Sequence, residues 1–376
     1  MKKIVIILSI LVVIFGINCE SITSSIPEPN ITVYKNKPYT KLILFTELDI
    51  KNDGTRIYGI DPNDSTLKKH IHISNLKSDG ADITSSGDII ITSRTDNKLY
   101  VLNEEGRIKQ KVDILSAPYH PIVLKDKIFI SSIDYSSKNE YTGVNLQIFS
   151  TNTYKKLKQL FLRGSVLRTD ISKHNNNIFI SNWHDVPTTH DSTDKYSDII
   201  KMNINSLDTN IISFKNKFFK YEDFNGFAVK DSILYTPGIF NEIIAKIDHK
   251  NNSLIQTRNL KDFSNIRNLI NENPSYFTLR LPKLHNGYLY TKIDLGVGCL
   301  DYITKFDPND LSLLKLTKIE GVKEFSRAKD HIYYKDMFVM KYESQVRFID
   351  IETGECVGKV ELPVKKGTEP DYPTDN

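Results

Sequence analysis

The sequence lacks an excess of charge of either sign and the short motifs that mark common enzymes. It has 50 lysines and arginines against 46 aspartates and glutamates, a net charge of +4, and its basic residues are scattered. This balance does not indicate a nucleic-acid partner. The nucleophile elbow GxSxG, the Walker loop, HExxH and CxxC are also absent. No motif therefore points to catalysis, and no cofactor is predicted.

Long apolar runs are missing except at the N-terminus, where two lysines precede the largely apolar residues 4–15. That run is too short for a mature membrane helix, which needs roughly 20 residues, but it is typical of a secretory signal peptide. The following Gly16-Ile17-Asn18-Cys19 resembles a bacterial lipobox in a looser form, with Gly16 and Asn18 at positions where Leu and Gly or Ala are usual. The resemblance implies that Cys19 becomes the lipidated first residue. The alternative is ordinary cleavage that leaves Cys19 free.

These features predict a location and a domain plan. The location is the bacterial cell envelope, with the protein anchored by lipid to a membrane and facing the periplasm or the exterior. The expected segments are a signal peptide at 1–18, a lipidated tether at 19–30, a folded domain at 31–363 and a disordered tail at 364–376. Only Cys299 and Cys356 remain in the folded domain. The repeat described next places them on opposite faces, so we predict that they do not pair.

The folded domain is built from one repeated hairpin, clearest at 346–362, where VRFIDIETGECVGKVEL reads as strand, tight turn and strand. Seven copies can be aligned on the residue that closes the first strand, at intervals averaging about 48 residues, a period typical of propeller blades. These closing residues are Asp61, Asn103, Ser150, Asn203, Asp248, Asp307 and Asp350. Their side chains are expected to bond backbone N–H groups two residues on and so to stabilise the turns.

A second apolar strand precedes each hairpin, at 42–48, 88–93, 127–132, 177–182, 232–237, 287–292 and 336–342. Together with a weaker innermost strand, this predicts an all-β fold: a single seven-bladed β-propeller of four-stranded antiparallel blades, with six or eight blades as alternatives. The blade strands are named A to D from the axis outward. The segment 32–34 is either strand A of the first blade or an added outer strand. Terminal strands are expected to join the first and last blades.

The repeat resembles those of the YVTN-type and PQQ-like β-propellers, an aliphatic strand followed by Asp, a Thr-Gly turn and Val-x-x-x-Val-x-Leu, best seen at 346–362. The resemblance covers about 32–363. It implies the fold but no activity, because members of that broad group bind ligands, act as scaffolds or catalyse reactions. Quinone enzymes of the group carry a tryptophan-rich repeat. This sequence has only Trp183, which argues against a quinoprotein.

A ligand site is expected on the face formed by the B–C and D–A connections, where the longest loops lie. The candidate ligand-binding residues on this face are Arg94, His120, Tyr135, Arg168, Trp183, His184, Arg280 and Arg327. The arginines would suit an anionic group or an acidic peptide, or would brace loops by bonding backbone carbonyls. The loop 183–198 also holds weak candidates for metal binding, His184, Asp185, His190 and Asp191, although a solvated polar loop is the commoner explanation. Residues 261–280 predict a short helix that packs on a D–A corner and shields the channel mouth, with Asp262 or Ser264 as its N-terminal cap and Asn273-Pro274 as its stop.

Two functions follow from these observations. The first is a non-enzymatic, membrane-anchored propeller that binds another envelope protein, a peptide or a small ligand on this face. The alternative is a metal-assisted hydrolase or lyase resembling the propeller lactonases, with Asp134, His184, Asp185 and Asp294 at its site.

Overall fold

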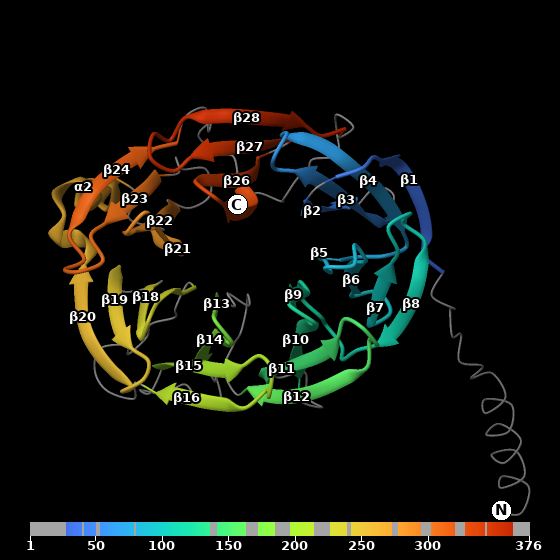
Figure 1. The fold of residues 1–376 in the computed structure, drawn as a ribbon, viewed down its shortest axis with the longest axis horizontal. Coiled ribbons are helices and arrows are strands. Elements are labelled where there is room, and N and C mark those ends of the chain that lie inside the picture. Colours follow the sequence, from blue (N-terminus) through green and yellow to red (C-terminus); the bar gives the residue numbers. More distant parts are fainter. Residues whose placement is uncertain are drawn as a thin grey trace, which may run out of the picture.

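The fold is a ring of seven four-stranded antiparallel sheets, or blades, arranged around a central axis (Figure 1). It is seen in a computed structural model that describes residues 28–39, 41–49, 53–78, 80–135, 141–162, 172–184, 196–213, 226–238, 242–272, 277–294, 302–319, 328–342 and 344–363. The predicted all-β class, the seven blades and the four strands per blade are confirmed.

Blades 1 to 4 occupy the first half of the ring. Blade 1 contains β1 (Asn30–Asn36), β2 (Ile43–Asp49), β3 (Gly54–Asp61) and β4 (Thr66–Ser74). Blade 2 contains β5 (Ala81–Ile83), β6 (Ile89–Ser93), β7 (Lys98–Leu102) and β8 (Ile108–Asp113). Blade 3 contains β9 (Ile122–Leu124), β10 (Lys127–Tyr135), β11 (Tyr141–Ser150) and β12 (Lys156–Leu162). Blade 4 contains β13 (Ser172–His174), β14 (Asn177–His184), β15 (Tyr196–Asn203) and β16 (Thr209–Ser213).

Blades 5 to 7 complete the ring. Blade 5 contains β17 (Ala228–Lys230), β18 (Ile233–Pro237), β19 (Ile243–Asp248) and β20 (Ser253–Asn259). Blade 6 contains β21 (Thr278–His285), β22 (Tyr288–Asp294), β23 (Tyr302–Phe306) and β24 (Leu313–Lys318). Blade 7 contains β25 (Ala328–Tyr334), β26 (Met337–Tyr342), β27 (Gln345–Asp350) and β28 (Cys356–Glu361).

The turn between strands C and D has the same hydrogen-bond pattern in nearly every blade. In six blades the side chain of the closing residue accepts a hydrogen bond from the backbone N–H two residues on, at 2.8 to 3.2 Å, as predicted. Asn103 differs, because its side chain accepts from the N–H of Arg107, four residues on. These seven residues therefore stabilise the C–D turns, the structural role predicted for them.

The fourth residue after the closing residue has a left-handed backbone in those six blades. Glycine fills this position only in blade 7, where a Cβ on Gly354 would lie 2.5 Å from the carbonyl oxygen of Lys318. The other blades use residues with a side chain, at φ 51 to 61°: Ser65, Tyr154, Leu207, Asn252 and Leu311. A left-handed residue with a Cβ costs about 1–2 kcal/mol. Tyr154, Leu207 and Leu311 are buried, so their packing offsets that cost.

The hydrophobic core lies between blades. Each of its seven clusters contains residues of two neighbouring blades, and together they form a closed series around the ring. The cluster between blades 7 and 1, for example, packs Phe45 and Tyr58 against Val339 and Phe348. Because a single four-stranded sheet cannot bury both of its faces alone, each blade depends on its two neighbours.

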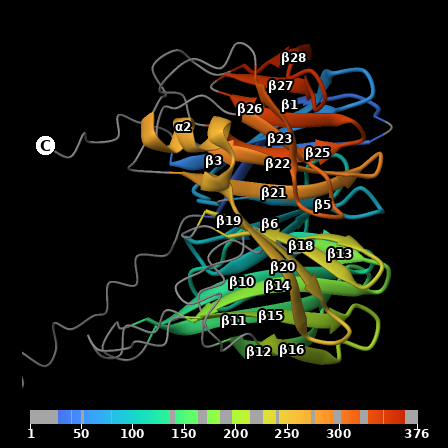
Figure 2. The ribbon, with the colours of Figure 1, turned by 90° about the vertical axis from the view of Figure 1, so that its left-hand side faces the viewer.

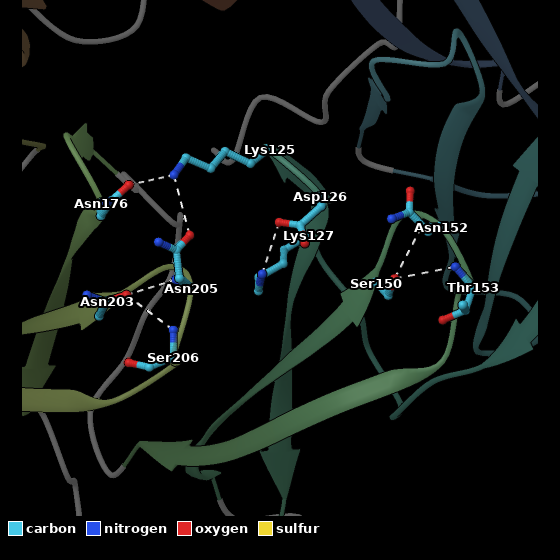
Figure 3. A network of polar contacts seen from close by, with 10 residues as sticks. All are labelled: Lys125, Asp126, Lys127, Ser150, Asn152, Thr153, Asn176, Asn203, Asn205 and Ser206. Carbon is cyan, nitrogen blue, oxygen red and sulfur yellow. Dashed lines mark hydrogen bonds and ion pairs between the residues drawn. The ribbon is translucent and has the colours of Figure 1, made fainter.

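Polar contacts also link each blade to the next, and lysine is the commonest donor. Figure 3 shows Lys125 of blade 3 bonding Asn176, at 2.6 Å, and Asn205, at 3.5 Å, in the turns of blade 4. Similar bonds run from Lys69 to the carbonyl of Glu104 and from Lys246 to that of Asn309. Many lysines thus have a structural role in the seams, which agrees with the scattered basic residues of the sequence.

Blade 1 departs from the other six. Its strand order is β1-β4-β3-β2, so β1 lies outside strand D and strand B, β2, is innermost. The segment 32–34 is therefore an added outer strand, and the described part of blade 1 has no strand A. The prediction that terminal strands join blades 1 and 7 is wrong for the described residues, since the four strands of each sheet come from one stretch of chain. The ring closes instead by side-chain packing at this seam.

The predicted short helix is present. A 3-10 turn, η1 (Leu260–Asp262), leads into α2 (Ser264–Glu272), whose Ile266 and Ile270 are buried in the cluster between blades 5 and 6. Asn259 caps the 3-10 turn by accepting from the N–H of Lys261 at 2.9 Å. Within the described ranges, no helix has the length and apolar character needed to cross a membrane.

Candidate functional site

The B–C and D–A connections lie on one face of the ring, and α2, which belongs to a D–A connection, marks that face on the left of Figure 2. We call it the loop face. The C–D turns, with the closing residues, lie on the opposite face. The described part of the loop face includes the B–C turn 94–97 of blade 2 and the D–A connection 114–121 that leads into blade 3.

Arg94 and Tyr119 form the centre of this described part. The Arg94 guanidinium lies over the Tyr119 ring, 5.1 Å from its centroid, and Nε donates to the carbonyl of Pro118 at 3.3 Å. The backbone N–H of Arg94 donates to the carbonyl of Lys77 at 2.9 Å. Arg94 thus braces a loop by bonding a carbonyl, one of the two roles predicted for it, while its side chain stays on the exposed surface.

The connection that carries Tyr119 is itself well anchored. The N–H of Tyr119 donates to Ser131 at 2.8 Å, its carbonyl accepts from Thr92 Oγ1 at 2.7 Å, and Pro118 forms a bridge with Ser132. These bonds attach the connection to strands β6 and β10. The loop face therefore presents Arg94 and Tyr119 on a fixed support.

His120 is exposed beside this pair and lies against Gly80. A Cβ built on Gly80 would be 1.6 Å from His120 Nδ1, so only glycine leaves room for the imidazole. Thus Arg94 and His120, both predicted from the sequence, lie on adjoining connections of blades 2 and 3. Together they give the face a guanidinium, an aromatic ring and an imidazole, groups that suit recognition of an anionic or aromatic surface.

The remaining predicted residues are placed less fully. Asp134 is the last residue but one of strand B of blade 3, and its Oδ1 accepts from Asn145 Nδ2 at 3.1 Å. Only the backbone is described for five residues, which lie in β10, β14, β21 and β22: Tyr135, Trp183, His184, Arg280 and Asp294. Nine lie outside the described residues: Cys19, Arg168, Asp185, His190, Asp191, Asn273, Pro274, Cys299 and Arg327. Cys356 is exposed and is a free thiol.

Neither a metal site nor a catalytic constellation emerges from the described residues. No three His, Cys, Asp or Glu side chains among them come together as metal ligands. For the predicted hydrolase site, the side-chain environment is described only for Asp134.

A buried charged group near the start of the ring was not predicted from the sequence. Arg56 donates to Asp49 Oδ2 through Nε at 2.9 Å and Nη2 at 2.6 Å, and His72 Nε2 lies 3.5 Å from the same oxygen. Burial alone would lower the pKa of Arg56, but these bonds outweigh it and raise the pKa. For His72, in contrast, the net effect is a lowered pKa, and burial is its main cause. The group fixes the end of β2 where the B–C connection of blade 1 begins.

A second missed feature joins blade 7 to blade 1 across the ring seam. Lys341 Nζ of β26 lies 3.6 Å from Glu47 Oε1 of β2, and Tyr58 Oη donates to Glu47 Oε2 at 3.0 Å. A buried lysine follows the same register in β22, where Lys292 lies over the Phe338 ring, 5.7 Å from its centroid. The sequence did carry a signal for this feature: Lys292 and Lys341 each interrupt a largely apolar B strand.

Comparisons with known proteins show no family for this chain. No family model and no curated protein matches the chain. Among solved structures, the chain is similar to Kluyveromyces lactis Hsv2, with 10% identity, 82% and 93% of the two chains covered and a TM-score of 0.49. It is similar to the β-propeller domain of Myceliophteria thermophila Cps50 (Swd1), with 9% identity over 86% of this chain and 90% of that one, and a TM-score of 0.48. It is also similar to BamB from Moraxella catarrhalis, with 8% identity over 80% of each chain and a TM-score of 0.46. At these identities and TM-scores the likeness says nothing about the function of this chain.

Proposed function

We propose that this protein is a lipid-anchored propeller of a bacterial cell envelope that binds a partner protein or peptide through its loop face, without catalysis. The observation that carries the proposal is the group of exposed Arg94, exposed His120 and half-buried Tyr119, held on a support of backbone hydrogen bonds. Such preorganised side chains reduce the entropy lost on binding. The repeat's resemblance to YVTN-type and PQQ-like propellers is part of the same proposal.

The anchor is supported by the sequence before the first described residue. A signal-like segment, a lipobox-like Cys19 and a Ser/Thr/Pro-containing stretch precede β1. The test is the intact mass of the N-terminal peptide of protein extracted from bacterial membranes. A peptide that begins at an acylated Cys19 supports the anchor, whereas cleavage elsewhere or a free Cys19 contradicts it.

Binding is tested by capture of partners from envelope extracts with the full chain. Arg94→Glu together with His120→Glu replaces the guanidinium and the imidazole with carboxylates and is expected to reduce capture of a specific partner at least about tenfold. The matched control is Arg107→Glu, in the same blade but in the C–D turn on the opposite face, which is expected to change nothing. If the double variant captured as much partner as Arg107→Glu, the partner would not bind through the loop face.

A further inference from the structure

Strand β1 fixes the point at which the N-terminal chain leaves the ring. It pairs antiparallel with β4, the outer strand of blade 1, from Asn30 opposite Ser74 to Asn36 opposite Lys69. Because β4 runs from the C–D turn toward the D–A connection, Ser74 lies at its loop-face end. The N-terminal end of β1 therefore lies at the outer rim on the loop-face side, and its C-terminal end lies toward the opposite face.

Glu28, the first described residue, is held at this rim by contacts with blades 1 and 2. Its carboxylate pairs with Lys111 of β8, and its carbonyl accepts from Asn75 Nδ2 at 3.4 Å. Lys111 and Asn75 lie near the loop-face ends of β8 and β4, the outer strands of the two blades. Ile31 of β1 packs against the core cluster between the same blades, so β1 lies over their seam (Figure 1).

The candidate site lies beside this exit point. Strand β8 ends at Asp113, two residues after Lys111, the residue that pairs with Glu28. The D–A connection that carries Tyr119 and His120 follows directly. The N-terminal chain and the candidate site therefore share one side of the ring, at blades 1 to 3.

The length of the chain limits the distance from this exit to the proposed acyl anchor. Cys19 precedes Glu28 by nine residues, which span at most about 32 Å when fully extended. The outer rim is at least as high as β1, whose seven residues span about 23 Å. The loop face can thus lie at the membrane with a relaxed chain. The opposite face reaches it only when most of that length runs along the rim, which costs conformational entropy.

We propose that the acyl anchor holds the loop face toward the membrane, so that its partner is a protein anchored or embedded in the same membrane. The inference rests on the lipid anchor of the proposed function and names the kind of partner. The guanidinium of Arg94, the ring of Tyr119 and the imidazole of His120 suit acidic or aromatic side chains on a part of that protein close to the bilayer. Holding both proteins on one membrane raises their effective concentration, which strengthens binding through so small a group.

The orientation is measured by energy transfer to the membrane. The acylated full chain, with Cys299→Ser and Cys356→Ser, carries one labelled cysteine and is bound to phosphatidylcholine vesicles with an acceptor dye on the headgroup. The label is at Ser116→Cys on the loop face or at Glu105→Cys in the C–D turn of blade 2, both exposed positions. We expect transfer at least about twofold more efficient from position 116, because the length of β8, about 20 Å, separates the two positions.

Equal transfer from the two positions, or more from position 105, overturns the inference while the lipid anchor stands. A chain that carries no acyl group and stays off the vesicles contradicts the lipid anchor itself, and the inference with it. The two failures are distinguished by the intact mass of the N-terminal peptide and by flotation of the protein with the vesicles.

A longer tether is the matched control. Insertion of about twenty glycine and serine residues between Ser24 and Ser25 keeps the anchor and β1 but lets either face reach the membrane. The difference in transfer between positions 116 and 105 is expected to fall to less than about half, with vesicle binding unchanged. An undiminished difference would contradict the role of the tether in setting the orientation.

The kind of partner is tested in cells. A photoreactive amino acid replaces Ser116, and the cross-linked protein is identified by mass spectrometry. We expect a protein with a membrane-spanning segment or an acyl anchor of its own, and no product from position 105. A soluble partner overturns the inference but leaves binding by the loop face intact. The absence of any product from positions 116 and 120 contradicts the proposed function.

Discussion

Tyr154 of blade 3 donates its hydroxyl to Asp88 Oδ2 of blade 2 at 2.6 Å. Lys109 donates to the same oxygen at 2.8 Å. Burial alone would raise the pKa of Asp88, but the hydrogen bonds from Lys109 and Tyr154 outweigh it and hold the pKa below its ordinary value. This contact shows how a turn of one blade is attached to the carboxylate of the blade before it.

Removing the Tyr154 hydroxyl should weaken that seam. We expect Tyr154→Phe to lower the free energy of unfolding by about 1–2 kcal/mol, because a hydrogen bond to a charged group is lost while the ring stays buried. Urea unfolding gives the value. Tyr34→Phe, at a ring that is 61% exposed, is the control and should change stability by less than about 0.5 kcal/mol. If both variants lost the same free energy of unfolding, the hydrogen bond from Tyr154 to Asp88 would make no particular contribution to stability.

Leu311 shows a conflict between backbone and packing. It is left-handed, with φ 58°, yet fully buried between blades 5 and 6. Leu311→Gly relieves the backbone cost of about 1–2 kcal/mol but empties a core position, so we expect a net loss of about 1–3 kcal/mol. Asn252→Gly at the same turn position of blade 5, where the side chain is exposed, should change stability by no more than about 0.5 kcal/mol. Thermal or urea unfolding of both variants makes the comparison, and a stabilising Leu311→Gly would contradict it.

His70 gives stability a dependence on pH. It is buried, stacked between Tyr34 and Tyr58, and burial together with nearby Arg56 lowers its pKa to about 4. Below pH 6.5 the unfolded chain binds the proton while the folded chain does not, so stability falls as the pH drops from about 6.5 toward 4. His72 and His249 act in the same direction.

His70→Phe keeps an aromatic ring in the stack and removes the titration. The difference in unfolding free energy between pH 7 and pH 4.5 should therefore be smaller in His70→Phe than in the wild type, by about 2 kcal/mol. Urea unfolding at both pH values measures this difference. An unchanged pH dependence would show that His70 titrates normally in the folded protein.

The seam between blades 7 and 1 should be as strong as the others. Phe348 at this seam and Phe129 at the seam of blades 3 and 4 are both almost fully buried. We expect Phe348→Ala and Phe129→Ala each to cost about 3–5 kcal/mol. If only Phe348→Ala were tolerated, the ring would be open at blade 1 in solution, which native-state hydrogen exchange of β2 and β26 would also report.

The sequence predicts the hairpins well because their signals are local. A closing residue such as Asp350, a turn and two alternating strands lie within about 17 residues, so one short stretch carries the full pattern. The helix α2 could also be predicted locally, from Asp262 or Ser264 as a cap and Asn273-Pro274 as a stop.

Other features depend on contacts between distant residues. The added strand β1 pairs with β4 although its own sequence fits strand A as well, and only the completed sheet distinguishes the two. The approach of Lys341 to Glu47 requires the ring to close. Arg94 and His120 were found because their loops adjoin predicted strands, but their support by Pro118 and Gly80 follows from the packing of two blades.

The central claim is that the loop face binds the partner, and cross-linking in living cells tests it most directly. A photoreactive amino acid replaces His120 in one strain and Arg107, in the C–D turn of blade 2, in another. We predict a cross-linked partner from position 120 and none from position 107. A partner cross-linked only from position 107, or from neither position, would contradict the claim.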